Sequence, residues 1–234
     1  MLLALATVTA ALAAEPLVLG GFTPPADPAA PPPGWEALTF PRVPRHTRYL
    51  VVREGDRWVL RAESDRAASA LYRPLDLDPK AYRVLSWRWK VENVVAKADP
   101  RRKEGDDYAA RVYVAFRYEP ASATLWERSR YAAYRLLHGR YPPGVVLNYV
   151  WESRLPVGTA LDNAYTDRAK IIVARSGGAL VGQWVSERHD IYADYRSIVG
   201  GEPPRIAGIA IMTDTDDTGE RAVAYYDALT LEPG

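Results

Sequence analysis

Three acidic side chains are the residues of this sequence best suited to catalysis. Asp107, Glu152 and Glu187 each lie in a segment where apolar and polar residues alternate, as they do in a half-buried β-strand. A glycosidase needs two carboxylates about 5 to 10 Å apart across a sugar. These residues would form such a site if their strands were neighbours, so a carboxylate-dependent enzyme acting on glycans is one hypothesis.

Asp106 and Asp107 form an adjacent acidic pair at the start of the segment 106–118. Neighbouring side chains of an extended strand point to opposite faces of its sheet. We therefore expect the two carboxylates not to share a site, and the pair gives little support for acid–base chemistry.

A second acidic group lies in the loop between the last two predicted strands, and its candidate metal ligands are Asp214, Asp216 and Asp217. Asp214, Asp216 and Thr218 match positions 1, 3 and 5 of an EF-hand loop, and Gly219 matches the glycine at position 6. The match ends at position 12, where Tyr225 replaces the bidentate glutamate. Two interpretations remain: a calcium site of another geometry, in which the ion offsets carboxylate repulsion, and a solvated turn.

The segment 106–118 also predicts a strand with one polar face. Apolar or aromatic residues occupy the even positions from Tyr108 to Tyr118, whereas Arg111 and Tyr113 lie between them. Hydrogen-bonding side chains with aromatic walls suffice for noncatalytic binding of a glycan or another polar small molecule. The residues expected to line this binding face are Arg88, Lys90, Asp107, Arg111, Tyr113, Asn148, Glu152, Gln183 and Glu187. A salt-bridged, solvated face is the alternative interpretation of the same residues.

Other kinds of chemistry lack support in the sequence. His46, His138 and His189 do not have metal-ligand spacing, and His189 beside Asp190 is typical of a strand-end surface pair. The sequence has no G-x-S-x-G elbow, P-loop or dinucleotide fingerprint. Nucleophilic, phosphoryl-transfer and nucleotide chemistries are therefore not indicated.

Strands must position most of these residues. In the segment 82–92, Leu85, Trp87 and Trp89 alternate with charged residues, which predicts one buried and one polar face. The same reasoning predicts strands at 17–22, 35–40, 48–53, 56–62, 67–75, 82–92, 106–118, 145–153, 168–175, 181–189, 205–213 and 220–231. Residues 54–56 should form a tight hairpin turn between two of these strands.

Two helices are expected to interrupt the strands. Residues 122–138 have apolar side chains at helical spacing, with Ser122 as N-cap and Gly139 beyond the end. A shorter helix is expected over 191–199, capped by Asp190 and followed by two glycines.

Composition limits the class of protein. The chain has 234 residues, a net charge of +1 and no cysteine. A chain of this length can bury a sizeable core without disulfides or a structural metal. Its near-neutral charge argues against a nucleic-acid partner, because such proteins concentrate Lys and Arg.

The first 14 residues, MLLALATVTAALAA, form an apolar run that ends in an A-x-A pattern. This run predicts a signal peptide, although it lacks the usual basic residues, and leaves 15–234 as a single domain. A periplasmic or secreted location follows. The run is too short for a membrane span, and no later segment is apolar enough to cross a bilayer. A buried N-terminal helix is the alternative.

Several motifs together carry a family resemblance. They are Trp87-Arg88-Trp89-Lys90, residues 106–113, residues 148–151, residues 184–195 and residues 212–219. As a set they resemble the exported bacterial family catalogued as domain of unknown function 3047, over about residues 17–231. The resemblance implies an envelope protein with no established activity and no assigned catalytic residues. The strand pattern is also similar to the jelly-roll sandwiches of carbohydrate-binding modules, which is an analogy of fold only.

These observations predict a mainly β protein, an antiparallel β-sandwich of jelly-roll type with one or two helical insertions. The leading hypothesis for its function is noncatalytic binding of a glycan or similar polar ligand on the sheet face around Arg111. The alternatives are the glycan-active enzyme and a structural or interaction module of the envelope.

Overall fold

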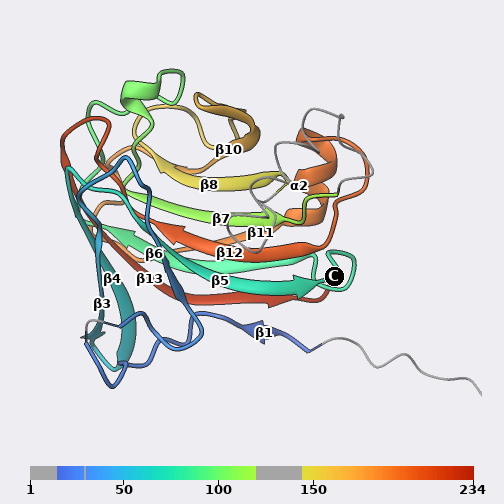
Figure 1. The fold of residues 1–234 in the computed structure, drawn as a ribbon, viewed down its shortest axis with the longest axis horizontal. Coiled ribbons are helices and arrows are strands. Elements are labelled where there is room, and N and C mark those ends of the chain that lie inside the picture. The colour runs from blue at the N-terminus through green and yellow to red at the C-terminus, as the bar shows by residue number, and fades with distance from the viewer. Residues whose placement is uncertain (1–14, 29, 120–143) are drawn as a thin grey trace, which may run out of the picture.

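Strands dominate the computed structural model, which describes residues 15–28, 30–119 and 144–234 (Figure 1). The elements are β1 (Leu17–Val18), β2 (Glu36–Leu38), β3 (Arg48–Glu54), β4 (Arg57–Asp65), β5 (Ala70–Leu77), β6 (Val84–Val91), η1 (Lys103–Gly105), β7 (Ala110–Phe116), β8 (Val146–Glu152), β9 (Ala160–Asn163), β10 (Thr166–Ser176), β11 (Val185–Asp190), α2 (Ile191–Ile198), β12 (Ile206–Met212) and β13 (Arg221–Glu232). The predicted signal peptide and the predicted helix 122–138 lie outside the described residues.

The strands form two sheets. Sheet A has the order β11-β6-β13-β4-β3, and β1 also pairs with β13. Sheet B has the order β2-β5-β12-β7-β8-β10-β9. The segment 106–118 therefore supplies β7, an inner strand of sheet B, as its alternation predicts.

Strand pairing gives the sandwich its jelly-roll topology. The pairs β4/β13, β5/β12, β6/β11 and β7/β8 are antiparallel and belong alternately to sheets A and B. The chain is thus one long hairpin rolled into two layers, which confirms the predicted fold class. One pair departs from the antiparallel pattern, because β10 runs parallel to β8.

Aromatic side chains join the two sheets. Trp87 and Trp89 alternate with polar residues along β6 and are buried. Trp89 contacts Trp151 of β8 with ring centroids 5.8 Å apart, and Trp87 contacts Tyr149 at 5.5 Å. Large rings in contact across the layers bury much apolar surface, so they make one core between the sheets.

Sheet B is covered on its second face as well. Val150, Ile171 and Val173 form an apolar cluster with Tyr108 on that face, and Met212 belongs to another cluster there. Central strands of sheet B are consequently buried on both sides. The expectation of a solvated polar face on β7 is wrong, because additional chain segments pack over it.

The hairpin β3–β4 turns at Gly55, whose φ of 63° suits the tight turn predicted there. Strand β3 is three strands away from β6 in sheet A, and its residue in register with Lys90 is Leu50. Glu54, at the end of β3, lies four residues further along that strand. On a flat sheet these positions would be about 20 Å apart. The Glu54 carboxylate nevertheless contacts Lys90, so the hairpin curls over the outer face of sheet A.

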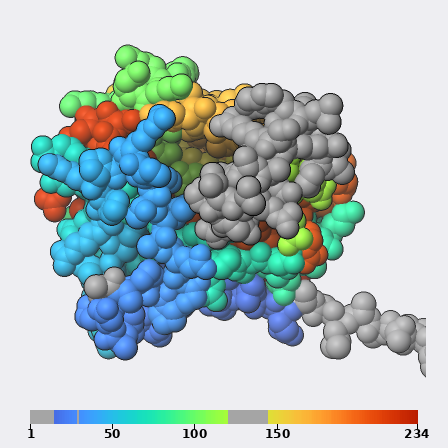
Figure 2. Space-filling model, viewed as in Figure 1, coloured from blue at the N-terminus to red at the C-terminus, as the bar shows by residue number. Residues whose placement is uncertain are grey.

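The helix α2 begins where the sequence predicts it, because the Asp190 carboxylate accepts a hydrogen bond from the Ala193 N–H at 2.9 Å. In the space-filling view, the N-terminal strands form one side of the molecule and the loop containing η1 forms its upper rim (Figure 2). Among the described residues, no helix has the length and apolar character needed to cross a membrane.

Candidate functional site

Arg111 of β7 lies at the centre of a buried polar network. Its Nε donates to Asp214 Oδ1 at 2.7 Å, and its Nη2 contacts both Asp214 Oδ2 and the Asp106 carbonyl. The guanidinium lies over the Tyr108 ring, 4.2 Å from its centroid. Only 3% of Arg111 is exposed. The bidentate pair with Asp214 fixes Arg111 in place, because two parallel charge-assisted bonds hold both its position and its orientation.

Asp106 and Asp107 both belong to this network, contrary to the expectation that they face opposite sides. Asp106 Oδ1 lies 3.5 Å from Arg111 Nη1, and Asp107 accepts from the Thr218 N–H at 2.6 Å. The difference arises because β7 begins at Ala110. The aspartates lie in the irregular chain after η1, where strand alternation does not apply.

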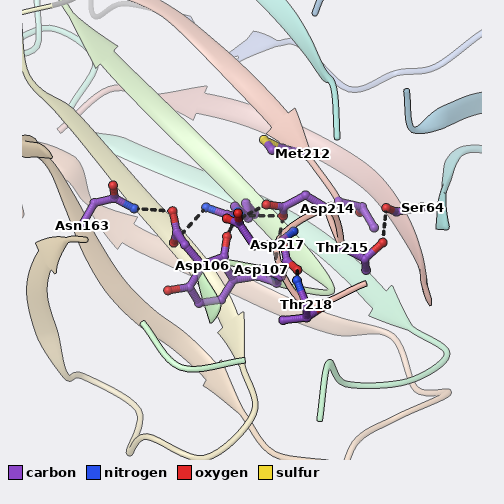
Figure 3. A network of polar contacts seen from close by, with 12 residues as sticks. Ser64, Asp106, Asp107, Asn163, Met212, Asp214, Thr215, Asp217 and Thr218 are labelled. Atoms are coloured by element: carbon purple, nitrogen blue, oxygen red, sulfur yellow. Dashed lines mark hydrogen bonds and ion pairs between the residues drawn. The ribbon is translucent and has the colours of Figure 1, made fainter. Parts of the chain in front are cut away.

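Three carboxylates converge beside Arg111, and Figure 3 labels two of them, Asp107 and Asp214. Oxygens of Asp107, Asp214 and Asp216 lie within 4.8 Å of one another. Burial raises the pKa of Asp214 and of Asp216, and repulsion from Asp107 raises both further. Calcium takes carboxylate oxygens as ligands, so these three residues could hold a divalent cation.

Asp217 does not join those three carboxylates, although the sequence groups it with Asp214 and Asp216. Its carboxylate accepts from the Tyr165 hydroxyl at 2.8 and 3.0 Å instead. Burial, with repulsion from Asp216 and Asp107, raises the pKa of Asp217 to about 6. The candidate ligand set is therefore the loop aspartates Asp214 and Asp216 with the distant Asp107.

Two of the residues predicted to bind a ligand around Arg111, namely Arg111 itself and Asn148, are buried. Asn148 of β8 lies opposite Tyr113 and is 1% exposed. The Tyr113 hydroxyl accepts from Arg111 Nη1 at 3.2 Å, so it belongs to the same buried network. Arg111 and Asn148 are therefore buried in sheet B, whereas Tyr113 is partly exposed, and the binding face around Arg111 stays a prediction.

Glu152 and Glu187 also have internal partners. The Glu152 carboxylate caps the turn after β8 by accepting the N–H groups of Arg154 and Leu155. Glu187 of β11 accepts two hydrogen bonds from Arg175 of β10, both at 2.9 Å, and therefore links sheet A to sheet B. Both carboxylates are buried, and within the described part of the chain they share no partner with Asp107.

The remaining predicted ligand residues lie on the other sheet. Arg88 and Lys90 project from β6 on the outer face of sheet A, and Gln183 is exposed in the turn before β11. The nine predicted residues therefore do not line one face. Strand order separates them, because β6 and β7 are consecutive in the chain but belong to different sheets.

Two aromatic rings flank Lys90 on the outer face of sheet A. Its Nζ lies 4.2 Å from the Tyr225 ring centroid and 5.5 Å from that of Trp184. The two rings are 6.4 Å apart in an edge arrangement. Arg88 lies over the Trp184 ring at 5.0 Å. We call Trp184, Lys90 and Tyr225 the aromatic row.

Hydrogen bonds hold the aromatic row in position. Trp184 Nε1 donates to Glu54 Oε2 at 3.0 Å, and the Tyr225 hydroxyl donates to Glu92 at 2.6 Å. Arg61 Nε donates to the same hydroxyl oxygen at 3.1 Å. Partial burial, together with the bond to Glu92, raises the pKa of Tyr225, so its hydroxyl stays neutral. Both rings remain partly exposed, which gives this face apolar surfaces surrounded by donors and acceptors.

Sequence reasoning missed Trp184 and Tyr225 as site residues. Each lies on the polar face of an alternating strand, because Trp184 is two residues from Ser186 and Tyr225 is two residues from Asp227. An aromatic residue at a position where the alternation predicts a polar one could have indicated a binding surface. Their proximity could not be predicted, because it depends on the order β11-β6-β13.

Comparisons with known proteins identify the family of this chain. The family model described as "Protein of unknown function (DUF3047)" matches residues 33–230. None of the curated proteins matches this chain. A solved structure of a CBM29-2 mutant, from a study of ligand recognition by family 29 carbohydrate binding modules, is similar over 94% of both chains, with 10% sequence identity and a TM-score of 0.39.

Proposed function

Because this chain belongs to the DUF3047 family of proteins of unknown function, we propose its function from the geometry: noncatalytic binding of a glycan on the outer face of sheet A. The observation that carries the proposal is the aromatic row, in which two partly exposed rings flank a cationic side chain.

The aromatic row suits a sugar for a chemical reason. A pyranose ring has an apolar C–H face, which packs on an aromatic ring, and hydroxyl groups at its rim, which need donors and acceptors. Trp184 and Tyr225 offer the apolar surfaces, and Arg61 and Arg88 place donors beside them. Both rings are already held by hydrogen bonds, so little side-chain entropy is lost when a ligand packs on them.

Binding is favoured over hydrolysis because the candidate catalytic carboxylates are engaged elsewhere. Asp107 accepts backbone N–H groups of the loop 214–219, Glu152 caps a turn, and Glu187 pairs with Arg175. A glycosidase requires two carboxylates facing the same sugar. Three carboxylates with separate internal partners give no support to that arrangement.

A glycan array followed by isothermal titration calorimetry tests the proposal. Trp184→Ala should weaken binding of the best array ligand about 10-fold or more, because it removes one stacking surface. Trp58→Ala is the matched control. Trp58 is 40% exposed but alternates to the opposite face of β4 from Arg61, so its loss should change the Kd less than 2-fold.

Two results would contradict glycan binding on this face. One is an array on which no glycan is bound above background, which would favour a structural or interaction module. The other is equal weakening by Trp184→Ala and Trp58→Ala, which would indicate that neither ring is part of a defined binding surface.

A further inference from the structure

A cavity of about 570 Å³ lies at one end of sheet A, where β4 ends and β13 begins. Its charged lining comprises Arg45, Arg48 and Arg221 against Glu63 and Asp65. Arg45 and Arg48 come from the start of β3 and the residues just before it, and Arg221 comes from the start of β13. A cavity of this size can accept a sugar unit or a similar small group.

The carboxylates of the cavity are outnumbered by guanidinium groups. Glu63 is contacted by Arg61 at 2.6 Å, by Arg221 at 3.5 Å and by Arg48 at 3.6 Å. The hydrogen bond from Arg61, together with the nearby charges of Arg221 and Arg48, lowers the pKa of Glu63. Glu63 is therefore ionised at neutral pH but balances only one of three positive charges.

Asp65, the second carboxylate, is already paired with Arg66 at 3.1 Å. The side chain of Arg45 has no ion pair or hydrogen bond among the described residues. Arg61 and Arg66 do not line the cavity, but each forms an ion pair with one of its two carboxylates, Glu63 and Asp65. The charges of these two carboxylates are thereby balanced, which leaves the three lining arginines as an excess of positive charge. Like charges gathered around a cavity attract an anion, and guanidinium groups recognise carboxylate, sulfate and phosphate through paired N–H donors.

Hydrogen bonds from Thr215, in the loop between β12 and β13, hold the wall of the cavity in place. The Ser64 and Thr215 hydroxyl groups are 2.6 Å apart, and Thr215 Oγ1 also accepts from the Arg66 N–H at 3.0 Å (Figure 3). The Ala68 N–H donates to the Arg45 carbonyl at 3.1 Å, which anchors the segment carrying that arginine. Backbone anchoring of this kind reduces the ordering cost of binding.

One side chain connects the lining of the cavity with the aromatic row. Arg61 bonds both Glu63 at the cavity and the Tyr225 hydroxyl in the row. Along β13, Arg221 and Tyr225 project from the same face, four residues and so about 14 Å apart. One extended oligosaccharide could therefore contact both features.

We propose that the ligand of sheet A is an acidic glycan whose carboxylate or sulfate group binds Arg45, Arg48 and Arg221 in this cavity. This inference rests on the proposed function, because it assigns the charge of the glycan that packs on the aromatic row.

Matched pairs of acidic and neutral polysaccharides distinguish the contribution of the acidic group to the binding affinity from that of the sugar rings. Polygalacturonate and its methyl ester test a carboxylate source, and dextran sulfate and dextran test a sulfate source. We expect one acidic member to bind at least 10-fold tighter than its neutral partner in calorimetry at 50 mM NaCl. This preference should shrink markedly at 500 mM NaCl, because exposed charges are then screened.

The double variant Arg45→Gln/Arg221→Gln should remove that preference and leave the affinity for the neutral partner within 2-fold. The matched control, Arg53→Gln/Arg102→Gln, removes two exposed arginines that do not line the cavity and should keep the preference. Both variants alter exposed side chains, so their melting temperatures should stay close to that of the native protein.

The possible failures are distinguishable. If acidic and neutral partners bind equally and Trp184→Ala weakens both, the inference is overturned while the proposed function stands. If the cavity variant keeps the acidic preference, the assignment to this cavity is overturned. If none of the four polysaccharides binds, the acidic-glycan inference is overturned, and the array alone decides on the proposed function.

Discussion

Arg111 is a buried positive charge beside Asp106 and Asp214, and Asp214 depends on it most directly. Both side chains of the pair are almost fully buried. Removing one partner of a buried ion pair leaves the other charge uncompensated, which typically costs about 3 to 5 kcal/mol. We therefore expect Arg111→Ala to reduce the free energy of unfolding by that amount in urea denaturation.

Two comparisons make the Arg111 prediction specific. Arg188→Ala breaks an exposed ion pair with Glu232 and should cost less than about 1 kcal/mol. Combining Arg111→Leu with Asp214→Leu removes both charges and should recover part of the loss. A loss for Arg111→Ala no larger than that for Arg188→Ala would show that the buried network does not contribute as argued.

Asp217 should make stability depend on pH. Its pKa in the folded protein is raised to about 6, mainly by burial. A carboxyl with a raised folded-state pKa contributes stability that is fully present below about pH 4 and is lost as the pH rises through about 6. Asp217→Asn removes this titration. The stability of the variant relative to the native protein should therefore increase between pH 4 and pH 7, by roughly 1 kcal/mol for this partly exposed group.

Urea denaturation at pH 4, 5, 6 and 7 measures the effect of Asp217→Asn. Amide oxygen can still accept the Tyr165 hydrogen bond, so the substitution changes charge more than contacts. A difference between variant and native protein that is constant over this range would contradict the raised pKa.

At the scale of elements, local patterns predicted most strands and the helix α2. Alternation in β6 identified which tryptophans are buried, and Asp190 identified the start of α2. The candidate site was predicted only in part. Asp214 and Asp216 are close because they are near in sequence, whereas Asp107 reaches them through pairing of distant segments. Strand order and the curl of β3–β4 arise from such nonlocal contacts, which local periodicity does not encode.

The turn before β7 positions Asp106 and Asp107 through a close backbone approach. A Cβ on Gly105 would lie 2.7 Å from the Asp99 nitrogen and 2.9 Å from its oxygen. The backbone would have to shift, and the Asp99 N–H bond to the Gly105 carbonyl, now 2.9 Å, would be disturbed. We expect Gly105→Ala to destabilise the protein by about 1 to 3 kcal/mol.

Gly178→Ala is the matched control for this turn, since a Cβ there would have no atom within 4 Å. It should leave stability unchanged or raise it by a few tenths of a kcal/mol, because alanine restricts the unfolded chain. Thermal denaturation of both variants compares them directly. Equal stability of the two variants would contradict the close approach at Gly105.

At the scale of the whole molecule, the two-layer architecture decides which predicted residues can act together. It places Arg88 and Lys90 on one outer face and buries Arg111 behind the other sheet. The fold class could be predicted, because few architectures are compatible with many short alternating strands and few helices. The proposed binding surface could not be predicted, because it is formed by strands that are distant in sequence.

One core joins both sheets, so we expect residues 15–234 to unfold as one cooperative domain. Trp89 of sheet A and Trp151 of sheet B are buried against each other, and tryptophan fluorescence therefore reports on the contact between the layers. Far-ultraviolet circular dichroism reports on the strands of both sheets. In urea the two probes should give coincident transitions with the same midpoint. Trp151→Phe should shift both midpoints downward together, because it loosens the shared core. Separate transitions, or a shift in only one probe, would mean that the sheets unfold independently.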